Sequence, residues 1–191
     1  MSDAMALLYR LAEHQAGHFT TGQARAEGVS DQLLRHHLNA GRIERATRGI
    51  YRLTHFPAQR HEDLIVVTLW AGQDSAVSHE TALVVHGIGD AMPSRIHVTV
   101  PRPFRGARAG VMVHHAALDE DDRTVRDDVP VTTVERTLLD ISGRSDVCLA
   151  RAAARDALEH GLTTRRRLSR ALERRPKASD AADLAGLLAE L

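Results

Sequence analysis

The stretch that decides the N-terminal fold is "EGVSDQLLRHHLNAGRIERATRGIYRL", residues 27–53. Gly28 is typical of the position just after a helix end, and Ser30 is a typical N-cap for the helix that follows. Val29 and Leu34 stand where an apolar staple forms across a helix start. These signals predict that one helix ends and another begins within about three residues, as in a helix-turn-helix.

Two more helices are expected upstream of this turn. Thr20 followed by Gln23 has the pattern of a capping box, which predicts a short helix over residues 21–27. An earlier helix over about residues 4–15 gathers its leucines on one side, where they pack inward. The three helices together have the layout of a DNA-binding helix-turn-helix domain.

The helix that starts after Ser30 separates its side chains into two faces. At 100° per residue, one face collects Leu33, Leu34, His37 and Leu38. The opposite face collects Gln32, Arg35, His36 and Asn39. We expect the first face to be buried, with His37 at the edge of the core, and the second to read bases, since Arg suits guanine and Asn or Gln suits adenine.

A basic hairpin follows this helix. Two short strands are predicted over residues 43–46 and 50–53, linked through Thr47, Arg48 and Gly49, where Gly49 supplies the positive φ of a tight turn. We expect contacts to the DNA backbone from this wing and from the start of the short helix over residues 21–27, through Thr21, Arg42, Arg45, Arg48 and Arg52.

Surface arginines often only solvate a small domain, but here they are coupled directly to a helix-turn-helix. The segment is therefore interpreted as a winged helix-turn-helix that binds double-stranded DNA. Single-stranded nucleic acid is a poorer ligand, because the six aromatic residues of the chain do not interleave with the wing as stacking platforms.

Length and charge predict a second domain. The 191 residues divide into a winged domain over residues 1–57 and a larger α+β domain over residues 58–191. The net charge is zero, yet residues 1–60 hold eight arginines against five acidic residues, while residues 61–100 hold one against five. The positive surface is therefore expected to be local.

The compartment is inferred from what the sequence lacks. One cysteine, Cys148, excludes intrachain disulfides and thiolate zinc clusters, and we expect it to be buried in an Ala- and Leu-rich helix. No apolar run approaches a membrane span, and no secretion signal is recognisable at the N-terminus. We expect a soluble cytoplasmic protein without membrane contacts.

The second domain mixes helices with a small sheet. A buried helix is predicted near Leu64–Trp70, another begins after Ser78, and strands are predicted in "RIHVTV", "GVMVHHAAL" and "DEDDRTVRDDVPVTT". Thr132 and Glu135 suggest a capping box for the helix "VERTLLDIS". Further helices are expected from near Ser145, Thr163 and Asp180, giving an α+β class.

A second basic surface is possible in this domain. Its candidates are Arg102, Arg105 and Arg108 of the loop between two strands, and Arg166, Arg167, Arg170 and Arg174 on one face of the helix after Thr163. Three roles stay open for it: contact with DNA, contact with an acidic partner, or simple solvation.

Four segments in order resemble one family. "FTTGQARAEGVSDQLLRHHLNAGRIERATRGIYRL", "VSHETALVVHGIG", "RIHVTVP" and "VPVTTVERTLLDIS" are similar to AbiEi-type antitoxins of type IV toxin-antitoxin and abortive-infection systems. The resemblance covers nearly the whole chain. It implies a repressor that acts on inverted repeats in its own promoter and a C-terminal domain that counteracts a nucleotidyltransferase toxin, without a direct complex being required.

An alternative is a nuclease-related DNA-processing protein of the restriction-endonuclease-like type, because longer proteins share the N-terminal layout. The single lysine, Lys177, has no acidic partner at the spacing such nucleases use, and we expect the chain to end before the nuclease segment. For the histidines, neither the pair His79 and His86 nor the pair His114 and His115 has an evident third metal ligand. We therefore expect no catalytic residues, no metal and no cofactor.

Overall fold

The computed structural model describes residues 3–142, 147–174, 184–186 and 189. It contains two compact units, one of residues 1–73 with 127–129, the other of residues 74–126 with 130–191. The boundary predicted at residue 57 falls inside the first unit, because helix α4 (Glu62–Ala71) belongs to that unit and packs on its strands β1 and β3. Lys177 and the helix start predicted at Asp180 lie outside the described residues.

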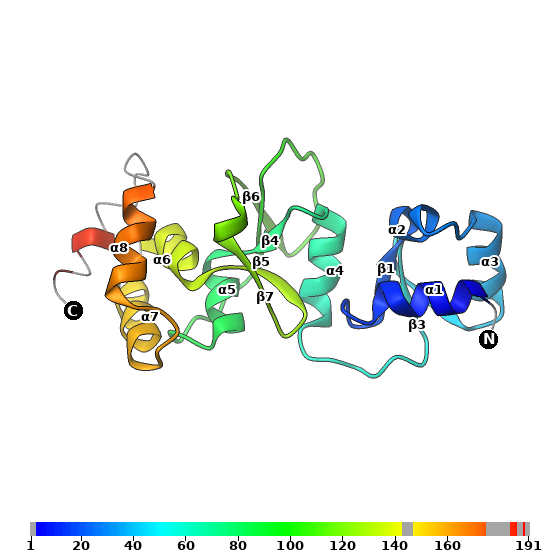
Figure 1. Cartoon of the computed structure of the whole chain (residues 1–191), viewed down its shortest axis with the longest axis horizontal. Helices are drawn as coiled ribbons and strands as arrows, with labels where there is room; N and C mark the ends of the chain where they lie inside the picture. Colours follow the sequence, from blue (N-terminus) through cyan, green and yellow to red (C-terminus); the bar gives the residue numbers. More distant parts are fainter. Residues whose placement is uncertain (1–2, 143–146, 175–183, 187–188, 190–191) are drawn as a thin grey trace. The chain divides into compact units, whose positions relative to one another are not determined.

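The first unit has the element order of a winged helix. Before α4 its elements are α1 (Asp3–Ala12), β1 (His18–Thr20), α2 (Thr21–Ala26), α3 (Asp31–Asn39), β2 (Ile43–Thr47) and β3 (Ile50–Leu53). The strands form an antiparallel sheet in the order β1-β3-β2, beside which the three helices pack (Figure 1). The predicted winged helix-turn-helix is confirmed.

Local side-chain hydrogen bonds fix where α2 and α3 begin. The Thr20 hydroxyl accepts from the Gln23 backbone N–H at 3.0 Å, and the Gln23 side chain accepts from the Thr20 N–H at 2.8 Å. The Ser30 hydroxyl accepts from the Leu33 N–H at 3.3 Å. Val29 and Leu34 are both buried, as an apolar staple requires. The predicted capping box and N-cap are therefore present.

The wing turn is tighter than predicted. Thr47 pairs with Ile50, so only Arg48 and Gly49 remain in the turn, and Gly49 has φ +77°. An irregularity between Arg45 and Thr47 adds a residue to β2 and lengthens that strand by one residue relative to the prediction.

The second unit joins a mixed sheet to a layer of helices. Its elements are β4 (Ala76–Val77), α5 (His79–His86), β5 (Ile96–Val100), β6 (Val111–His115), the 3₁₀ turn η1 (Glu120–Asp122), β7 (Arg123–Arg126), β8 (Val129–Thr132), α6 (Val134–Ser142), α7 (Val147–Glu159) and α8 (Arg165–Arg174). The sheet order is β6-β5-β4-β8-β7, with β5 parallel to β6 and β4 parallel to β8. Helix α6 packs against α5, α7 and α8 (Figure 1), which confirms the α+β class.

Two local predictions for this unit were wrong. The cap of helix α6 lies one residue later than the predicted capping box. The Thr133 hydroxyl accepts a hydrogen bond from the Arg136 N–H, while Thr132 ends β8 and is hydrogen-bonded to Thr137. Cys148 is exposed, because the buried side of α7 is its alanine stripe, Ala150, Ala153, Ala154 and Ala157.

The helix start predicted near Ser145 lies outside the described residues, and α7 is described from Val147. Among the residues that the structure describes, no helix has both the length and the apolar character needed to cross a membrane.

Candidate nucleic-acid interface

The outward face of α3 presents the four predicted base-reading residues together. Gln32, Arg35, His36 and Asn39 are all exposed. On the opposite side of the same helix, Leu34 is 3 % and His37 is 1 % exposed. This division leaves a polar helix face with donors and acceptors that can reach base edges in a major groove.

His37 is buried beneath this face, as predicted. Burial lowers its pKa, and the nearby charges of Arg42 and His36 lower it further. The side chain is therefore mainly uncharged near neutral pH, which suits its place among apolar neighbours of the helix-turn-helix core.

Arg42 links the recognition helix to the wing. Its Nη2 lies 2.8 Å from Nε2 of His36. Arginine has donors only, so His36 accepts this hydrogen bond through an unprotonated nitrogen. The pair holds the end of α3 next to the start of β2 and brings a guanidinium to the edge of the base-reading face.

The wing presents two further exposed arginines. Arg48 stands in the turn, and Arg45 lies on β2 with its guanidinium carbon 5.8 Å from the centre of the Tyr51 ring. That distance is within the range of a cation–π contact, which limits the directions the Arg45 side chain can take.

Thr21 ties the wing to α2. Its backbone N–H donates to the Gly49 carbonyl at 2.9 Å, and its hydroxyl donates to the same carbonyl at 3.3 Å. Thr21 was predicted as a DNA-backbone contact; in this structure its hydroxyl holds the wing turn against the start of α2.

Arg52 differs from Arg45 and Arg48 because its guanidinium is mostly buried and paired within the unit, including with Glu44 of β2 at 3.6 Å. Its side chain is 14 % exposed and donates to the carbonyls of Leu53 and Phe56 and to the Glu62 carboxylate at 3.2 Å. Burial opposes ionisation of Glu62, but hydrogen bonds from the Gln59 N–H and from Arg52 outweigh it and lower the Glu62 pKa. Arg52 therefore connects β3 to the start of α4.

An ion pair that the sequence analysis missed orients α3. The Arg25 guanidinium donates to both carboxylate oxygens of Asp31, at 2.8 Å and 2.6 Å, across the turn between the helices. The hydrogen bond from Arg25 lowers the Asp31 pKa. The six-residue spacing spans a turn rather than one helix, so helical periodicity could not reveal it.

The second basic surface is less uniform than predicted. Arg102 and Arg105 are exposed on the loop between β5 and β6, and Arg102 lies 3.8 Å from Asp74, whereas Arg108 is half-buried. On α8, Arg166 and Arg170 are exposed, while Arg167 pairs with the buried Glu135 at 2.9 Å and Arg174 pairs with Asp121. Two of the four α8 arginines, Arg167 and Arg174, are thus paired with acidic residues of the same unit.

Arg136, from the motif "VPVTTVERTLLD", is a structural residue. It is 4 % exposed and donates to the Ala117 carbonyl at 2.8 Å, to Asp140 at 2.7 Å and to Asp122 at 3.2 Å. These contacts attach α6 to the segment around η1. Arg136 therefore gives this motif a structural role in the second unit.

Comparison with known families agrees with this geometry. Residues 6–54 match the model described as transcriptional regulator, AbiEi antitoxin, and residues 75–190 match the AbiEi antitoxin C-terminal domain. The chain belongs to the AbiEi antitoxin family. One family model matches within each unit of this AbiEi protein, so the resemblance inferred from four sequence segments is confirmed.

A solved structure has a similar fold. The crystal structure of the RV2827C protein from Mycobacterium tuberculosis aligns with a TM-score of 0.50 at 15 % sequence identity, over 97 % of this AbiEi chain and 80 % of that chain. At this identity the likeness concerns the fold alone. The comparison with curated proteins gives no match.

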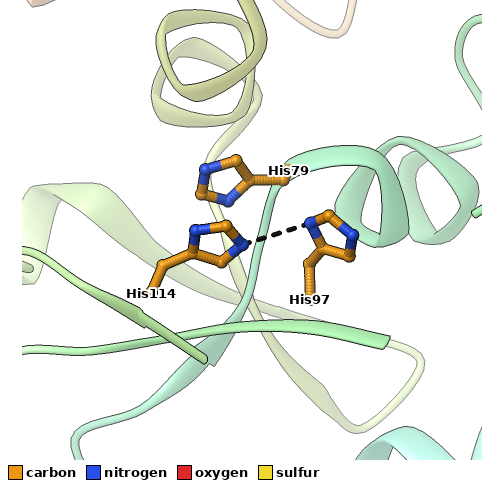
Figure 2. Close-up of side chains that lie close together, drawn as sticks. All are labelled: His79, His97 and His114. Atoms are coloured by element: carbon orange, nitrogen blue, oxygen red, sulfur yellow. Dashed lines mark hydrogen bonds between the residues drawn. The ribbon is translucent and has the colours of Figure 1, made fainter. Parts of the chain in front are cut away.

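A cluster of three histidines in the second unit was also missed. Ring nitrogens of His79, His97 and His114 lie within 4.8 Å of one another (Figure 2). In the sequence, His79 pairs by spacing with His86 and His114 stands beside His115, and neither pair has an evident third ligand. The third histidine comes from β5, and only the pairing of β5 with β6 brings it to the others.

Proposed function

We propose that this AbiEi protein is a sequence-specific repressor that binds double-stranded operator DNA in its own promoter. The observation that supports this most directly is the exposed polar face of α3 beside a basic wing, in an established winged-helix topology. Winged helices of this layout place such a helix in the major groove.

The residues divide into two kinds of contact. Gln32, Arg35, His36 and Asn39 read base edges, and Arg42, Arg45 and Arg48 contact phosphates. Thr21 and Arg52 act indirectly in this proposal, since their side chains hold the wing in place.

The second function that we propose is antagonism of a nucleotidyltransferase toxin by the part of the chain after residue 57. The match of residues 75–190 to the antitoxin C-terminal domain supports it. The basic loop with Arg102 and Arg105 and the exposed Arg166 and Arg170 of α8 are candidate surfaces. Their competing role is extra phosphate contact when two protomers occupy an inverted repeat.

Mobility shifts on the promoter fragment test the first proposal. The double variant Arg35→Ala with Arg48→Ala should bind at least about tenfold more weakly, because each change removes a contact to bases or phosphate. The matched control is Arg10→Ala with Arg60→Ala, which removes two exposed charges from the same unit away from α3 and the wing. Equal affinities of the two double variants would refute the proposal.

Co-expression with the neighbouring nucleotidyltransferase tests the second proposal, antagonism of the toxin. The full chain with Arg35, Arg45 and Arg48 all changed to Ala should still restore growth while it no longer represses the promoter. If wild type restores growth and this variant does not, repression and toxin antagonism are one function, and the assignment of antagonism to the part of the chain after residue 57 is wrong.

A further inference from the structure

Three imidazoles from three separate elements meet in the second unit. His79 begins α5, His97 lies on β5 and His114 lies on β6. His114 Nε2 lies 3.2 Å from His97 Nδ1, and the rings of His79 and His114 stack with centroids 3.7 Å apart (Figure 2). His79 and His97 are each 8 % exposed, and His114 is half-buried.

Sheet register explains how these residues come together. In the parallel pair, Thr99 of β5 stands opposite His114 of β6. Side chains alternate along a strand, so His97 shares a face with Thr99 and therefore with His114. The Thr99 hydroxyl donates to Ser78 Oγ at 2.8 Å, and Ser78 precedes His79. The start of α5 is thus attached over the same face of the sheet.

Oxygen atoms accompany the nitrogen cluster. A carboxylate oxygen of Glu80 lies 2.9 Å from His97 Nδ1, and Ser78 Oγ lies 2.9 Å from His79 Nδ1. His79 itself has φ +53°, a backbone conformation that costs free energy in a residue with a side chain. Backbone strain of this kind clusters at binding sites, and here it occurs at a residue of the histidine cluster.

We propose that His79, His97 and His114 bind one divalent transition-metal ion of the zinc class, and that Glu80, whose carboxylate lies 2.9 Å from His97 Nδ1, turns toward the ion as the acidic fourth ligand. Imidazole nitrogens suit this class of ion, and Zn–N distances of about 2.0–2.1 Å in a tetrahedral site place ligand nitrogens roughly 3.3 Å apart. The pair His97 and His114 already has nearly this separation, whereas His79, whose ring is stacked on that of His114 with centroids 3.7 Å apart, has to turn out of this stack to direct a nitrogen at the ion.

The ion would cross-link the start of α5 to two strands. Its ligands come from elements that are otherwise joined by hydrogen bonds and packing, so binding stabilises the second unit by mass action. The first unit contributes none of these ligands. Metal supply would then change the stability of the unit matched to the antitoxin C-terminal domain without altering the recognition helix.

Metal titration of the full chain, prepared without a histidine tag and stripped with a chelator, tests this site. Zn²⁺ should bind with a stoichiometry of one and raise the melting temperature, and Co²⁺ should give the visible absorption bands of tetrahedral coordination. His97→Gln and His114→Gln should each weaken binding by at least about tenfold. Glu80→Gln should weaken binding less than either histidine variant.

The matched control is His115→Gln, which changes an exposed histidine on the next residue of the same strand. It should bind metal as the wild type does. Circular dichroism of the metal-free variants checks that each is folded, and a histidine variant that does not fold is replaced by His79→Gln.

Absence of binding at micromolar Zn²⁺, or an equal loss in His114→Gln and His115→Gln, would overturn the proposal and leave the cluster as a hydrogen-bonded histidine network. An unchanged affinity in Glu80→Gln would overturn the assignment of the carboxylate as a ligand.

Discussion

The wing and helix α6 use the same residue type in opposite ways. Arg45 and Arg48 of the wing are exposed, whereas Arg136 of α6 is 4 % exposed and meets the carboxylates of Asp122 and Asp140. Both kinds of arginine remain protonated in a protein. What differs is the source of the compensating negative charge, which lies within the chain for Arg136 and, in our proposal, comes from DNA phosphates for Arg45 and Arg48.

This difference explains why a chain of zero net charge can have a DNA-binding surface. A guanidinium compensated by nearby carboxylates contributes little to the field outside the protein, while exposed guanidinium groups attract phosphate. Net charge therefore says less about the ligand than the partners of individual arginines. The following predictions test this comparison, from the largest expected effect to the smallest.

Arg136→Leu should lower the free energy of unfolding of the second unit by about 3–5 kcal/mol, because it removes a buried guanidinium that pairs with the carboxylates of Asp122 and Asp140. Urea unfolding followed by circular dichroism measures the loss. The exposed Arg170→Leu is the control and should change stability by less than about 0.5 kcal/mol. Equal losses in the two variants would mean that Arg136 is not a structural cross-link.

Variants of Arg52 and Arg48 should affect different properties of the protein, although both residues belong to one hairpin: Arg52→Ala its stability and Arg48→Ala its DNA binding. Arg52→Ala removes donors to Glu62 and to two carbonyls and should cost about 1–3 kcal/mol of stability. Arg48→Ala should leave stability unchanged and lower the salt slope of DNA binding by about one. Melting curves and mobility shifts at several salt concentrations check both, and a reversed pattern would exchange the roles of the two residues.

Acidification should destabilise both units. Burial lowers the pKa of His37 in the first unit and of His86 in the second, so the unfolded chain, with histidine pKa values near about 6.5, binds more protons than the folded one. Their contribution to stability is complete above about pH 7.5 and declines as the pH falls through about 6.5.

Melting temperatures at pH 7.5 and pH 5.5 measure this effect, which should be smaller in the His37→Leu variant. The carboxylates with lowered pKa, Asp31 and Glu62, act in a more acidic range and do not account for a loss in this window. A higher melting temperature at pH 5.5 than at pH 7.5 would contradict the assignment.

Arg174→Ala should have the smallest effect. Its ion pair with Asp121 is solvent-exposed on both sides, so the loss should be about 0–1 kcal/mol and should shrink further in high salt. Comparison with Arg136→Leu in the same unfolding assay then measures how burial changes the value of an arginine–aspartate pair.

Much of the winged unit was predictable because its signals are local. A capping box between Thr20 and Gln23, an N-cap at Ser30 and the two faces of α3 involve residues within about one helical turn. The Arg48–Gly49 turn was located to within one residue for the same reason. Exposure of Gln32, Arg35, His36 and Asn39 follows directly from the helix period.

Other features depend on residues far apart in the chain. Arg52 belongs to a basic hairpin by sequence, yet its guanidinium is paired within the unit, with Glu44 of β2 at 3.6 Å and with Glu62 of the next helix at 3.2 Å. Helical periodicity could not predict the ion pair between Arg136 and Asp122 either, because these residues meet only where α6 packs beside η1.

The sequence by itself therefore determined where helices begin, which face of α3 is polar and which hairpin is basic, because these follow from backbone geometry over a few residues. Only the tertiary structure decided which arginines are compensated internally and that His79, His97 and His114 share one site. The physical reason is that parallel strand pairing and helix packing join residues whose separation along the chain has no fixed period.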